Sequence, residues 1–387
     1  MKIVHVINYF QPKLGYQETF LAREQIRMGH EVYMIASDRY YPFPDFEKTY
    51  APLLGSRRRP AGFSIEEGIS TYRLKTLFDI RCRVWLINLE KTVRFLDPDL
   101  VISHAVLSNS FRLAKMRLRG ARFKLIVDDH MDIFARDDIA GKIYYALKRM
   151  RAGRELVPWV DKFVGVSRQT CRHLEEKDGI PKEKITCIPL GSDSRLYQYD
   201  RAKREAMRHR LGIADNDVLI VYTGKYNFAK GVDTLAAAFN KMETCRVFLL
   251  LVGGGTAEFK QRLIDCLSPE KRKRMLFQPF VPAAELPAFY SAADICVWPK
   301  ETSTSILDAM SCQRPVVGCD VEAVRERLVN DNGLTYQTGN AEALAEKLDY
   351  LCRHEEVRYE MGRRGRELIE KRFSWEIIAQ KFIDCAG

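Results

Sequence analysis

Long apolar runs are missing from this sequence, and no stretch approaches the roughly 20 apolar residues that a membrane-spanning helix needs. The first residues, Met1 to Ile7, are too short in their apolar part for a signal peptide and lack a small-residue cleavage site. They predict a strand instead. We therefore expect a protein that stays in the cytoplasm.

Paired cysteines and several common catalytic signatures are also missing. The ten cysteines include no C-x-x-C pair, which disfavours a zinc site and a disulfide framework and predicts buried thiols. No P-loop, H-E-x-x-H or G-x-S-x-G sequence occurs. Gly253 to Gly255 lack the G-x-G-x-x-G spacing, so an NAD enzyme is disfavoured. We expect neither a metal nor a bound cofactor.

What the sequence does contain is enough apolar material for more than one core. At 387 residues, of which 46% are hydrophobic and 29% charged, the chain predicts two globular domains. The formal charge of +11 indicates an anionic partner, which could be a nucleotide, a nucleic acid or an acidic membrane surface.

Short apolar runs alternate with segments of helical periodicity, which is typical of parallel α/β architecture. Lys2 to Asn8 predicts the first strand, and Glu18 to Met28 predicts a helix that Gly29 ends. Further strands are expected at 32–36, 100–102, 124–127, 162–166, 218–222, 247–252, 275–277, 295–298 and 315–317. The alternation pauses near residues 190–200, where we place the domain boundary. Residues 38–70 read as an insertion or a long loop.

The first segment that could carry chemistry runs from Tyr222 to Asp233. It leaves a predicted strand and enters a helix expected over Thr234 to Phe239. Ligands of α/β proteins bind at such strand ends, and Lys225 and Lys230 there can grip one diphosphate from two sides. Two solvated surface lysines beside a turn remain the alternative.

The second such segment runs from Trp298 to Met310. Its Ser and Thr residues predict a helix that begins near residue 303, whose free backbone N–H groups would attract an anion. Asp308 would lie about one turn into that helix, where a carboxylate can accept hydrogen bonds from two ribose hydroxyls. An ordinary acid in a first helical turn is the alternative.

Several motifs occur in an order that resembles family 4 of the retaining glycosyltransferases. They are Gly224-Lys225, Lys230 to Asp233, Val252 to Gly255, Phe280 to Asp294, Asp308-Ala309-Met310 and Pro315-Val316-Val317. Asn8 to Glu18 is similar to the family's first loop, Val164 to Ser167 to a late first-domain strand, and Phe373-Ser374-Trp375 to its terminal helix. The resemblance extends over nearly the whole chain.

The resemblance implies an α/β protein of the GT-B fold, with two facing Rossmann-like domains. Residues 1–192 would form the acceptor-side domain and residues 193–371 the domain that binds the donor nucleotide. Residues 372–387 would form a terminal helix that returns to the first domain.

The resemblance also implies a donor site. Lys225 and Lys230 would contact the donor diphosphate and act in catalysis. Asp308 takes the place of the second of two glutamates that the family separates by seven intervening residues, so the first would stand eight positions earlier. The position of the first glutamate holds Lys300, and Glu301 is the nearest acid. The donor-binding residues implied are Gly15, Tyr16, Gly224, Lys225, Lys230, Gly253, Val281, Thr302, Ser303, Thr304, Ser305, Ile306 and Asp308.

His130 follows the predicted strand at 124–127, where the family commonly has a histidine near the transferred sugar. A lone histidine is otherwise more often structural, but the resemblance favours a catalytic role. Gly15 resembles the loop glycine whose backbone approaches the donor phosphates, because a side chain there would collide. Tyr16 stands where the family often has a second glycine.

Two basic stretches in the first domain have two interpretations. They contain Arg112, Lys115, Arg117, Arg119, Arg122 and Lys124, and Lys142, Lys148, Arg149, Arg151 and Arg154. Solvated helix faces are the simpler interpretation. Interleaved aromatic and apolar residues also fit a surface drawn to anionic lipid.

We therefore predict a retaining, metal-independent hexosyltransferase that moves a sugar from a UDP or GDP sugar to a glycan or lipid-linked acceptor hydroxyl. We expect it to act in cell-surface glycan, glycolipid or polysaccharide synthesis. We expect no nucleic-acid partner, and contact with the cytoplasmic face of a membrane stays one of the two interpretations of the basic stretches. A sugar-nucleotide epimerase on the same fold, or a basic membrane-binding protein without activity, are the alternatives.

Overall fold

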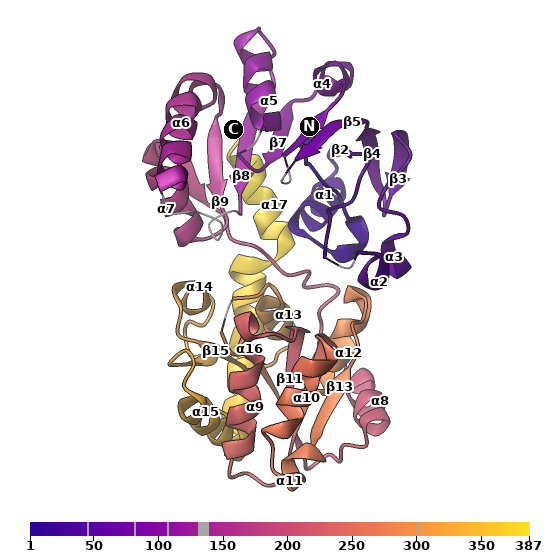
Figure 1. Cartoon of the computed structure of the whole chain (residues 1–387), viewed down its shortest axis with the longest axis vertical. Helices are drawn as coiled ribbons and strands as arrows, with labels where there is room; N and C mark the ends of the chain where they lie inside the picture. The colour runs from indigo at the N-terminus through magenta and orange to yellow at the C-terminus, as the bar shows by residue number, and fades with distance from the viewer. Residues whose placement is uncertain (45, 81–82, 107, 131–138, 301) are drawn as a thin grey trace. The chain divides into compact units, whose positions relative to one another are not determined.

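The computed structural model describes all residues except 45, 81–82, 107, 131–138 and 301. The chain divides into two compact units (Figure 1), one formed by Met1–Leu190 with Trp375–Gly387 and the other by Gly191–Ser374. The expected boundaries, after residues 192 and 371, fall within three residues of these.

Unit 1 is built on an eight-stranded sheet in which only β3 pairs antiparallel. Its strand order is β10 (Ile185–Cys187), β9 (Lys162–Gly165), β8 (Lys124–Asp129), β7 (Leu100–His104), β1 (Lys2–Val6), β2 (Glu31–Ser37), β4 (Ile69–Leu74) and β3 (Gly62–Glu66). A separate hairpin joins β5 (Thr76–Ile80) to β6 (Arg83–Leu86).

Helices cover both faces of the unit 1 sheet. They are α1 (Gln17–Arg27), α2 (Phe46–Thr49), α3 (Ala51–Leu54), α4 (Leu89–Leu96), α5 (Ser108–Leu118), α6 (Ile139–Glu155), α7 (Arg168–Glu176) and α17 (Trp375–Asp384). Successive residues of β1 enter different cores: Ile3 packs in one hydrophobic cluster, and Val4 and Val6 pack in another. This is the period-two alternation of a sheet that is buried on both faces.

Unit 2 is built on a six-stranded sheet in which all pairs are parallel. Its order is β13 (Met275–Gln278), β12 (Val247–Gly254), β11 (Val218–Lys225), β14 (Ile295–Trp298), β15 (Val316–Cys319) and β16 (Gly333–Tyr336). Its helices are α8 (Arg201–Leu211), α9 (Val232–Lys241), α10 (Ala257–Asp265), α11 (Pro269–Arg272), α12 (Leu286–Ala292), α13 (Ser305–Ser311), α14 (Glu322–Arg325), α15 (Ala341–Arg353) and α16 (Glu355–Leu368).

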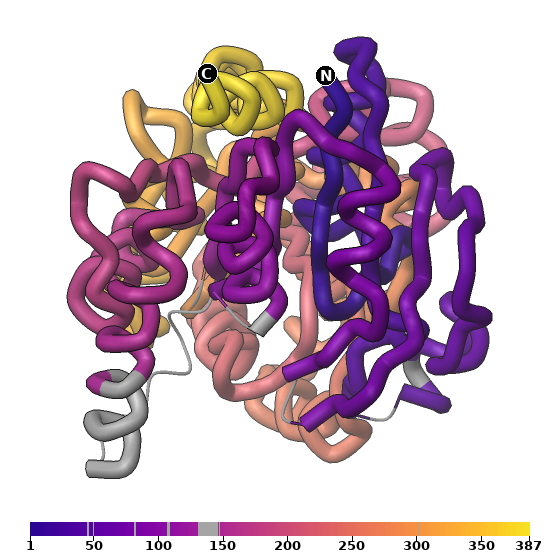
Figure 2. The backbone as a smooth tube through the Cα atoms, turned by 90° about the horizontal axis from the view of Figure 1, so that it is seen from above, coloured from indigo at the N-terminus to yellow at the C-terminus, as the bar shows by residue number. Residues whose placement is uncertain are grey.

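The terminal helix α17 packs on α1 in unit 1, where the two helices lie side by side (Figure 1). Its buried side chains include Ile378 and Phe382, and the ring of Trp375 stacks on Phe20 with centroids 5.6 Å apart. Both chain termini therefore lie close together in this unit (Figure 2).

Three expectations need correction. Residues 38–70 are not one long loop, because β3 and the start of β4 lie within them and β4 pairs with β2. The helix expected from residue 303 begins at Ser305. The cysteines are not all buried, since Cys187, Cys245 and Cys266 are exposed. None of the helices in the described ranges is long and apolar enough to span a bilayer.

Candidate active site

A small hollow of about 40 Å³ lies at the centre of the unit 2 sheet, where β11 and β14 end. Its lining residues come from the ends of these two strands and from the segments that follow them: Tyr222, Thr223, Gly224, Lys225, Lys230, Trp298, Pro299, Thr302 and Ser303. The strand order reverses between β11 and β14, because β12 and β13 extend the sheet one way and β15 and β16 the other. Ligands of open α/β sheets bind at such a switch point.

Beside this hollow, the backbones of β11 and β12 are in close contact. Gly224 and Gly253 face each other across the β11–β12 pair, with φ of 147° and 143°. A Cβ atom added to Gly253 would lie 2.0 Å from the carbonyl oxygen of Gly224, so only glycine fits there.

The two lysines of the hollow stand on different local structures. Lys225 is the last residue of β11 and is exposed. Lys230 ends a short 3₁₀ helix over Phe228–Lys230, whose start is capped by the Asn227 side chain accepting from the backbone N–H of Lys230 at 2.9 Å. The fold therefore places both ammonium-bearing side chains on one hollow, as the spacing predicts.

Side-chain hydrogen bonds hold the opposite wall. The indole Nε1 of Trp298 donates to the carbonyl oxygen of Thr223 at 3.2 Å, which ties the end of β14 to the end of β11. The Tyr336 hydroxyl donates to the carbonyl oxygen of Pro299. The Ser303 side chain accepts from the backbone N–H of Ser305, the first residue of α13, at 3.3 Å, while the N-cap residue Thr304 makes no capping bond with its side chain.

Asp308 lies in the first turn of α13 and is half-buried. Its Oδ1 accepts a hydrogen bond from the Ser192 hydroxyl at 2.7 Å. Burial raises the pKa of Asp308 to about 7, against the lowering effect of that hydrogen bond. The guanidinium of Arg327, whose pKa burial lowers to about 10, donates to the carbonyl oxygen of Ser303 at 2.6 Å.

The hollow gathers some of the expected donor residues and leaves others outside. Gly224, Lys225, Lys230, Thr302 and Ser303 line it. The expected residues outside its lining are Gly253, Val281, Thr304, Ser305, Ile306 and Asp308. The side chains of Val281 and Ile306 are buried in the unit 2 core. Glu301 lies outside the described residues.

In unit 1 the expected loop residues follow β1. Gly15 adopts a left-handed conformation at φ 66°, and Tyr16 precedes α1 and is 42% exposed. The strand order of this sheet also reverses, between β1 and β7, so these loops stand at a second switch point.

His130 lies just after β8 and its side chain is 37% exposed. Its Nε2 is 3.5 Å from Oδ2 of Asp128, which is fully buried. Desolvation opposes protonation of His130, but the hydrogen bond and charge of Asp128 outweigh it and raise the pKa of His130. The ring is thus held toward its protonated form.

A buried polar chain continues behind Asp128. His104 Nδ1 is 3.0 Å from Asp128 Oδ2, and Gln17 donates to the same oxygen at 2.9 Å. His5 Nδ1 lies 2.9 Å from His104 Nε2. Burial, together with the neighbouring His104, lowers the pKa of His5 to about 3, so this ring is neutral.

None of the sequence motifs pointed to these supporting residues. One sequence feature could have indicated them. His5 stands between Val4 and Val6 in an apolar strand, and a buried histidine needs hydrogen-bond partners. The partners of His5 were not deducible, because His104 comes from a different strand and Gln25 from a helix.

One group of side chains has the spacing of metal ligands. In the described ranges, His104, Asp128 and His130 offer donor atoms within 4.8 Å of one another. Asp128 Oδ2 already accepts from His104 and Gln17, so we interpret the group as a hydrogen-bonded cluster.

Several residues of the basic stretches serve the fold. Arg112 pairs with Glu90 and covers the ring of Trp85 at 4.3 Å. Arg117 pairs with Asp161. In the second stretch, Lys148 pairs with the buried Asp178 at 2.7 Å, Arg149 donates to the carbonyl oxygen of Glu176, and Arg151 pairs with Glu155 at 3.1 Å.

Comparisons with known proteins identify the family of both halves. The family described as Glycosyltransferase Family 4 matches residues 19–196, and the family Glycosyl transferases group 1 matches residues 217–354. Over 247 residues the chain is 26% identical to D-inositol 3-phosphate glycosyltransferase of Xylanimonas cellulosilytica, covering 61% of this chain and 59% of the relative. Over 221 residues it is 27% identical to the capsular polysaccharide biosynthesis glycosyltransferase CapM of Staphylococcus aureus, covering 54% and 57%. The chain thus spans less than two thirds of these relatives.

Solved structures share the fold at low identity. A glycosyltransferase from Rickettsia africae superposes with a TM-score of 0.75 at 17% identity, covering 100% of this chain and 97% of that one. HepE from Anabaena, solved in complex with UDP, superposes with a TM-score of 0.74 at 17% identity, covering 99% of both chains. With both halves matched and the whole fold shared, the chain belongs to the family 4 (group 1) glycosyltransferases of the GT-B fold.

Proposed function

We propose that this chain transfers a sugar from a nucleoside diphosphate sugar to an acceptor hydroxyl, with retention at the anomeric carbon. The observation that carries the proposal is the hollow at the β11–β14 switch point, which brings Lys225, Lys230 and Thr302–Ser303 together. Two cations and a hydroxyl-rich turn at such a position suit a diphosphate.

The diphosphate is the leaving group, and its negative charge grows as the bond to the sugar breaks. Lys225 and Lys230 would stabilise this charge from two sides of the hollow. Positioned cations of this kind supply the electrostatic stabilisation that a metal ion supplies elsewhere, so the reaction we propose proceeds without one.

Asp308 would bind the nucleoside. Its carboxylate lies beyond the hollow at the start of α13, and Ser192 fixes the orientation of Oδ1. A carboxylate in this orientation keeps Oδ2 as an acceptor for ribose hydroxyls.

His130 would act beside the transferred sugar. The acceptor oxygen would bond to the anomeric carbon on the face from which the diphosphate leaves, and the acceptor proton would pass to the departing phosphate oxygen. The raised pKa of His130, caused by Asp128, favours an imidazolium there, which stabilises negative charge on oxygen. The left-handed Gly15 would let backbone approach the donor phosphates.

Glu301 remains our proposed contact to the donor sugar. We expect Glu301→Ala to change the preference among donor sugars while leaving the affinity for free UDP or GDP unchanged.

The names of the relatives support cell-surface glycan synthesis as the setting, and HepE was solved with UDP. A GDP-mannose-dependent mannosyltransferase of Corynebacterium glutamicum is also similar, at 25% identity, so the base stays open between uracil and guanine. A thermal-shift screen of UDP and GDP sugars would identify it, because a ligand at 100 times its Kd stabilises by about 2.7 kcal/mol.

Activity is tested by incubating the full chain with labelled sugar nucleotides, with and without membrane extract. Label transferred to an acceptor supports the proposal. Conversion to a free epimer, or no reaction with any donor that stabilises the protein, contradicts it.

We also propose peripheral contact with an anionic membrane through unit 1. The formal charge of +11 supports it. We expect this contact to use exposed basic residues other than the arginines that form ion pairs within unit 1.

A further inference from the structure

A cleft of about 670 Å³ lies between the carboxyl ends of α4 and α5, away from the residues assigned above. Its lining includes Arg94 from α4, Met116 and Arg119 from the end of α5, and Arg122 from the connection to β8. The two helices are neighbours in unit 1 (Figure 1). Both end at the edge of the sheet opposite to His130, because α5 follows β7 and leads into β8.

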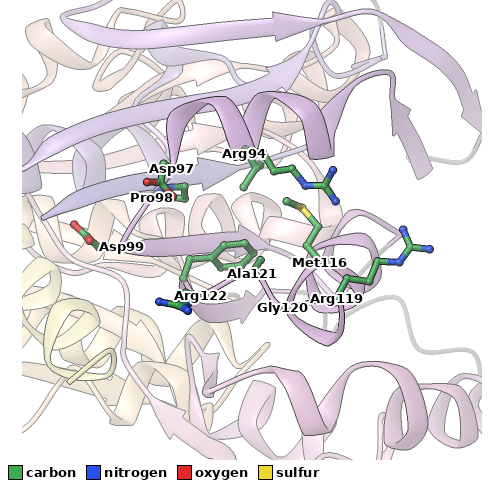
Figure 3. Close-up of a pocket in the computed structure, with 11 residues that line it drawn as sticks. Arg94, Asp97, Pro98, Asp99, Met116, Arg119, Gly120, Ala121 and Arg122 are labelled. Carbon is green, nitrogen blue, oxygen red and sulfur yellow. The ribbon is translucent and has the colours of Figure 1, made fainter.

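The cleft is arginine-rich on one side. Arg94 and Arg119 extend toward the same side, with Met116 between them in the view of Figure 3, while Arg122 extends the other way toward the side of Asp97 and Asp99. All three arginines are exposed. The side that holds Arg94 and Arg119 therefore presents two positive charges, and the acids of the cleft lie on the other side.

Each of these two arginines stands beside a large exposed apolar residue. Phe95 follows Arg94 and is 74% exposed, and Leu118 precedes Arg119 and is 57% exposed. Lys91 and Lys115, one turn before Phe95 and Leu118 on the same helices, are exposed as well.

We propose that this cleft is a docking site for the anionic phosphate head group of a bilayer lipid. Arg94 and Arg119 bind the phosphate, and Phe95 and Leu118 enter the acyl region beside it. Guanidinium groups pair with phosphate oxygens in two-point geometry, and apolar side chains next to cations are the composition of interfacial surfaces. The inference rests on the membrane contact proposed above and names its residues.

The two exposed apolar side chains favour a lipid surface over a free anion as the partner of this cleft. Phe95 and Leu118 would remain in water with a soluble phosphate bound, whereas a bilayer removes both from water while the arginines stay at head-group depth. Arg117 and Arg112, the neighbours along α5, are engaged with Asp161 and Glu90, so they do not contribute.

The test is flotation of the full chain with vesicles of phosphatidylcholine alone, or of equal parts phosphatidylcholine and phosphatidylglycerol. We expect binding to the anionic vesicles and a loss on the order of 30-fold in Arg94→Gln/Arg119→Gln, from two basic groups near the surface. Phe95→Ser/Leu118→Ser should also weaken binding. Raising the salt from about 0.1 M to 1 M, which shortens the screening length from about 10 Å to 3 Å, should release the wild-type protein.

The matched control is Lys273→Gln/Lys371→Gln, which removes the same formal charge from exposed positions of unit 2. It should bind as the wild type does. Equal losses in the control and in the arginine variant would overturn the proposal in favour of net charge alone. No binding to anionic vesicles, or full binding by Phe95→Ser/Leu118→Ser, would also overturn it.

A further arm separates the two sources of phosphate. Calorimetry measures whether glycerol phosphate binds the free protein. If it binds the wild type but not the arginine variant, and the wild type does not bind vesicles, the cleft is a site for a soluble anion instead. None of these readouts requires sugar transfer, and nucleotide binding by the same variants should be unchanged. Failure of the docking proposal is therefore distinguishable from failure of the proposed activity.

Discussion

The Ser192 hydroxyl donates to Oδ1 of Asp308 at 2.7 Å, and this bond orients a carboxyl group whose pKa burial raises to about 7. Ser192 lies just after the chain enters unit 2, and its backbone N–H donates to the carbonyl oxygen of Phe373 at 2.8 Å, just before the chain leaves it. Ser192, which orients the proposed ribose contact, is thus bonded to the segment through which the chain leaves unit 2.

This relationship predicts a pH dependence of stability. Since the folded pKa of Asp308 lies above its unfolded value, the folded protein holds a proton that the unfolded chain releases. Stability should therefore fall as pH rises from about 4 to 7, by a few kcal/mol at most. We expect Asp308→Asn to remove this part of the fall, measured by urea unfolding at several pH values. An unchanged pH profile in the variant would contradict the raised pKa.

The same group should control nucleotide affinity. A carboxylate accepts ribose hydrogen bonds better than a protonated carboxyl group, so affinity for UDP or GDP should rise as pH passes through about 7 in the wild type. The phosphate of the nucleotide also titrates and changes the affinity with pH. Asp308→Asn is the control, because its affinity depends on pH through the phosphate but not through residue 308. Parallel affinity curves for both proteins would exclude Asp308 from the ribose contact.

The lysines of the hollow should contribute to diphosphate binding. We expect Lys225→Ala and Lys230→Ala each to weaken binding by roughly 1.5–3 kcal/mol, the contribution of a charged hydrogen bond. Calorimetry with nucleoside diphosphate measures this, and the exposed Lys273→Ala is the control. Wild-type affinity in both variants would remove the unit 2 hollow as the donor site.

His130 should affect turnover rather than donor binding. We expect His130→Ala to retain donor affinity and to lose kcat. Asp128→Asn should lower the pKa of His130, because the charge that raises it is gone, and should move the alkaline decline of kcat to lower pH. If kcat of His130→Ala equals that of the wild type, His130 is structural.

The terminal helix should stabilise unit 1. The side chain of Phe382 is fully buried in the unit 1 core, so Phe382→Ala should cost about 3–5 kcal/mol of unfolding free energy. Removal of the residues after Ser374 should have a larger effect on the same transition, while unit 2, which keeps Phe373, retains its nucleotide affinity. Calorimetric scans with and without nucleotide separate the two transitions. Equal melting of the unit 1 transition in the truncated and full chains would contradict this packing.

The sequence by itself determined the alternation of strands and helices, since buried parallel strands read as continuous apolar runs such as 218–222 and 247–252. It also determined the pairing of Lys225 with Lys230, because five residues of local chain around a turn keep the two close. The sequence also marked Gly253 as a glycine of the donor site. It did not show why glycine is required there, which is the close approach of the Gly224 carbonyl oxygen across the β11–β12 pair.

The tertiary structure decided which distant side chains meet. Ser192 reaches Asp308 across 116 positions, and His5 reaches His104 across 99, so neither contact leaves a local pattern in the sequence. It also decided which arginines remain exposed. Arg117 lies on α5 and Arg119 just past its end, yet Arg117 pairs with Asp161 while Arg119 is exposed, because burial depends on what packs against each side of the chain.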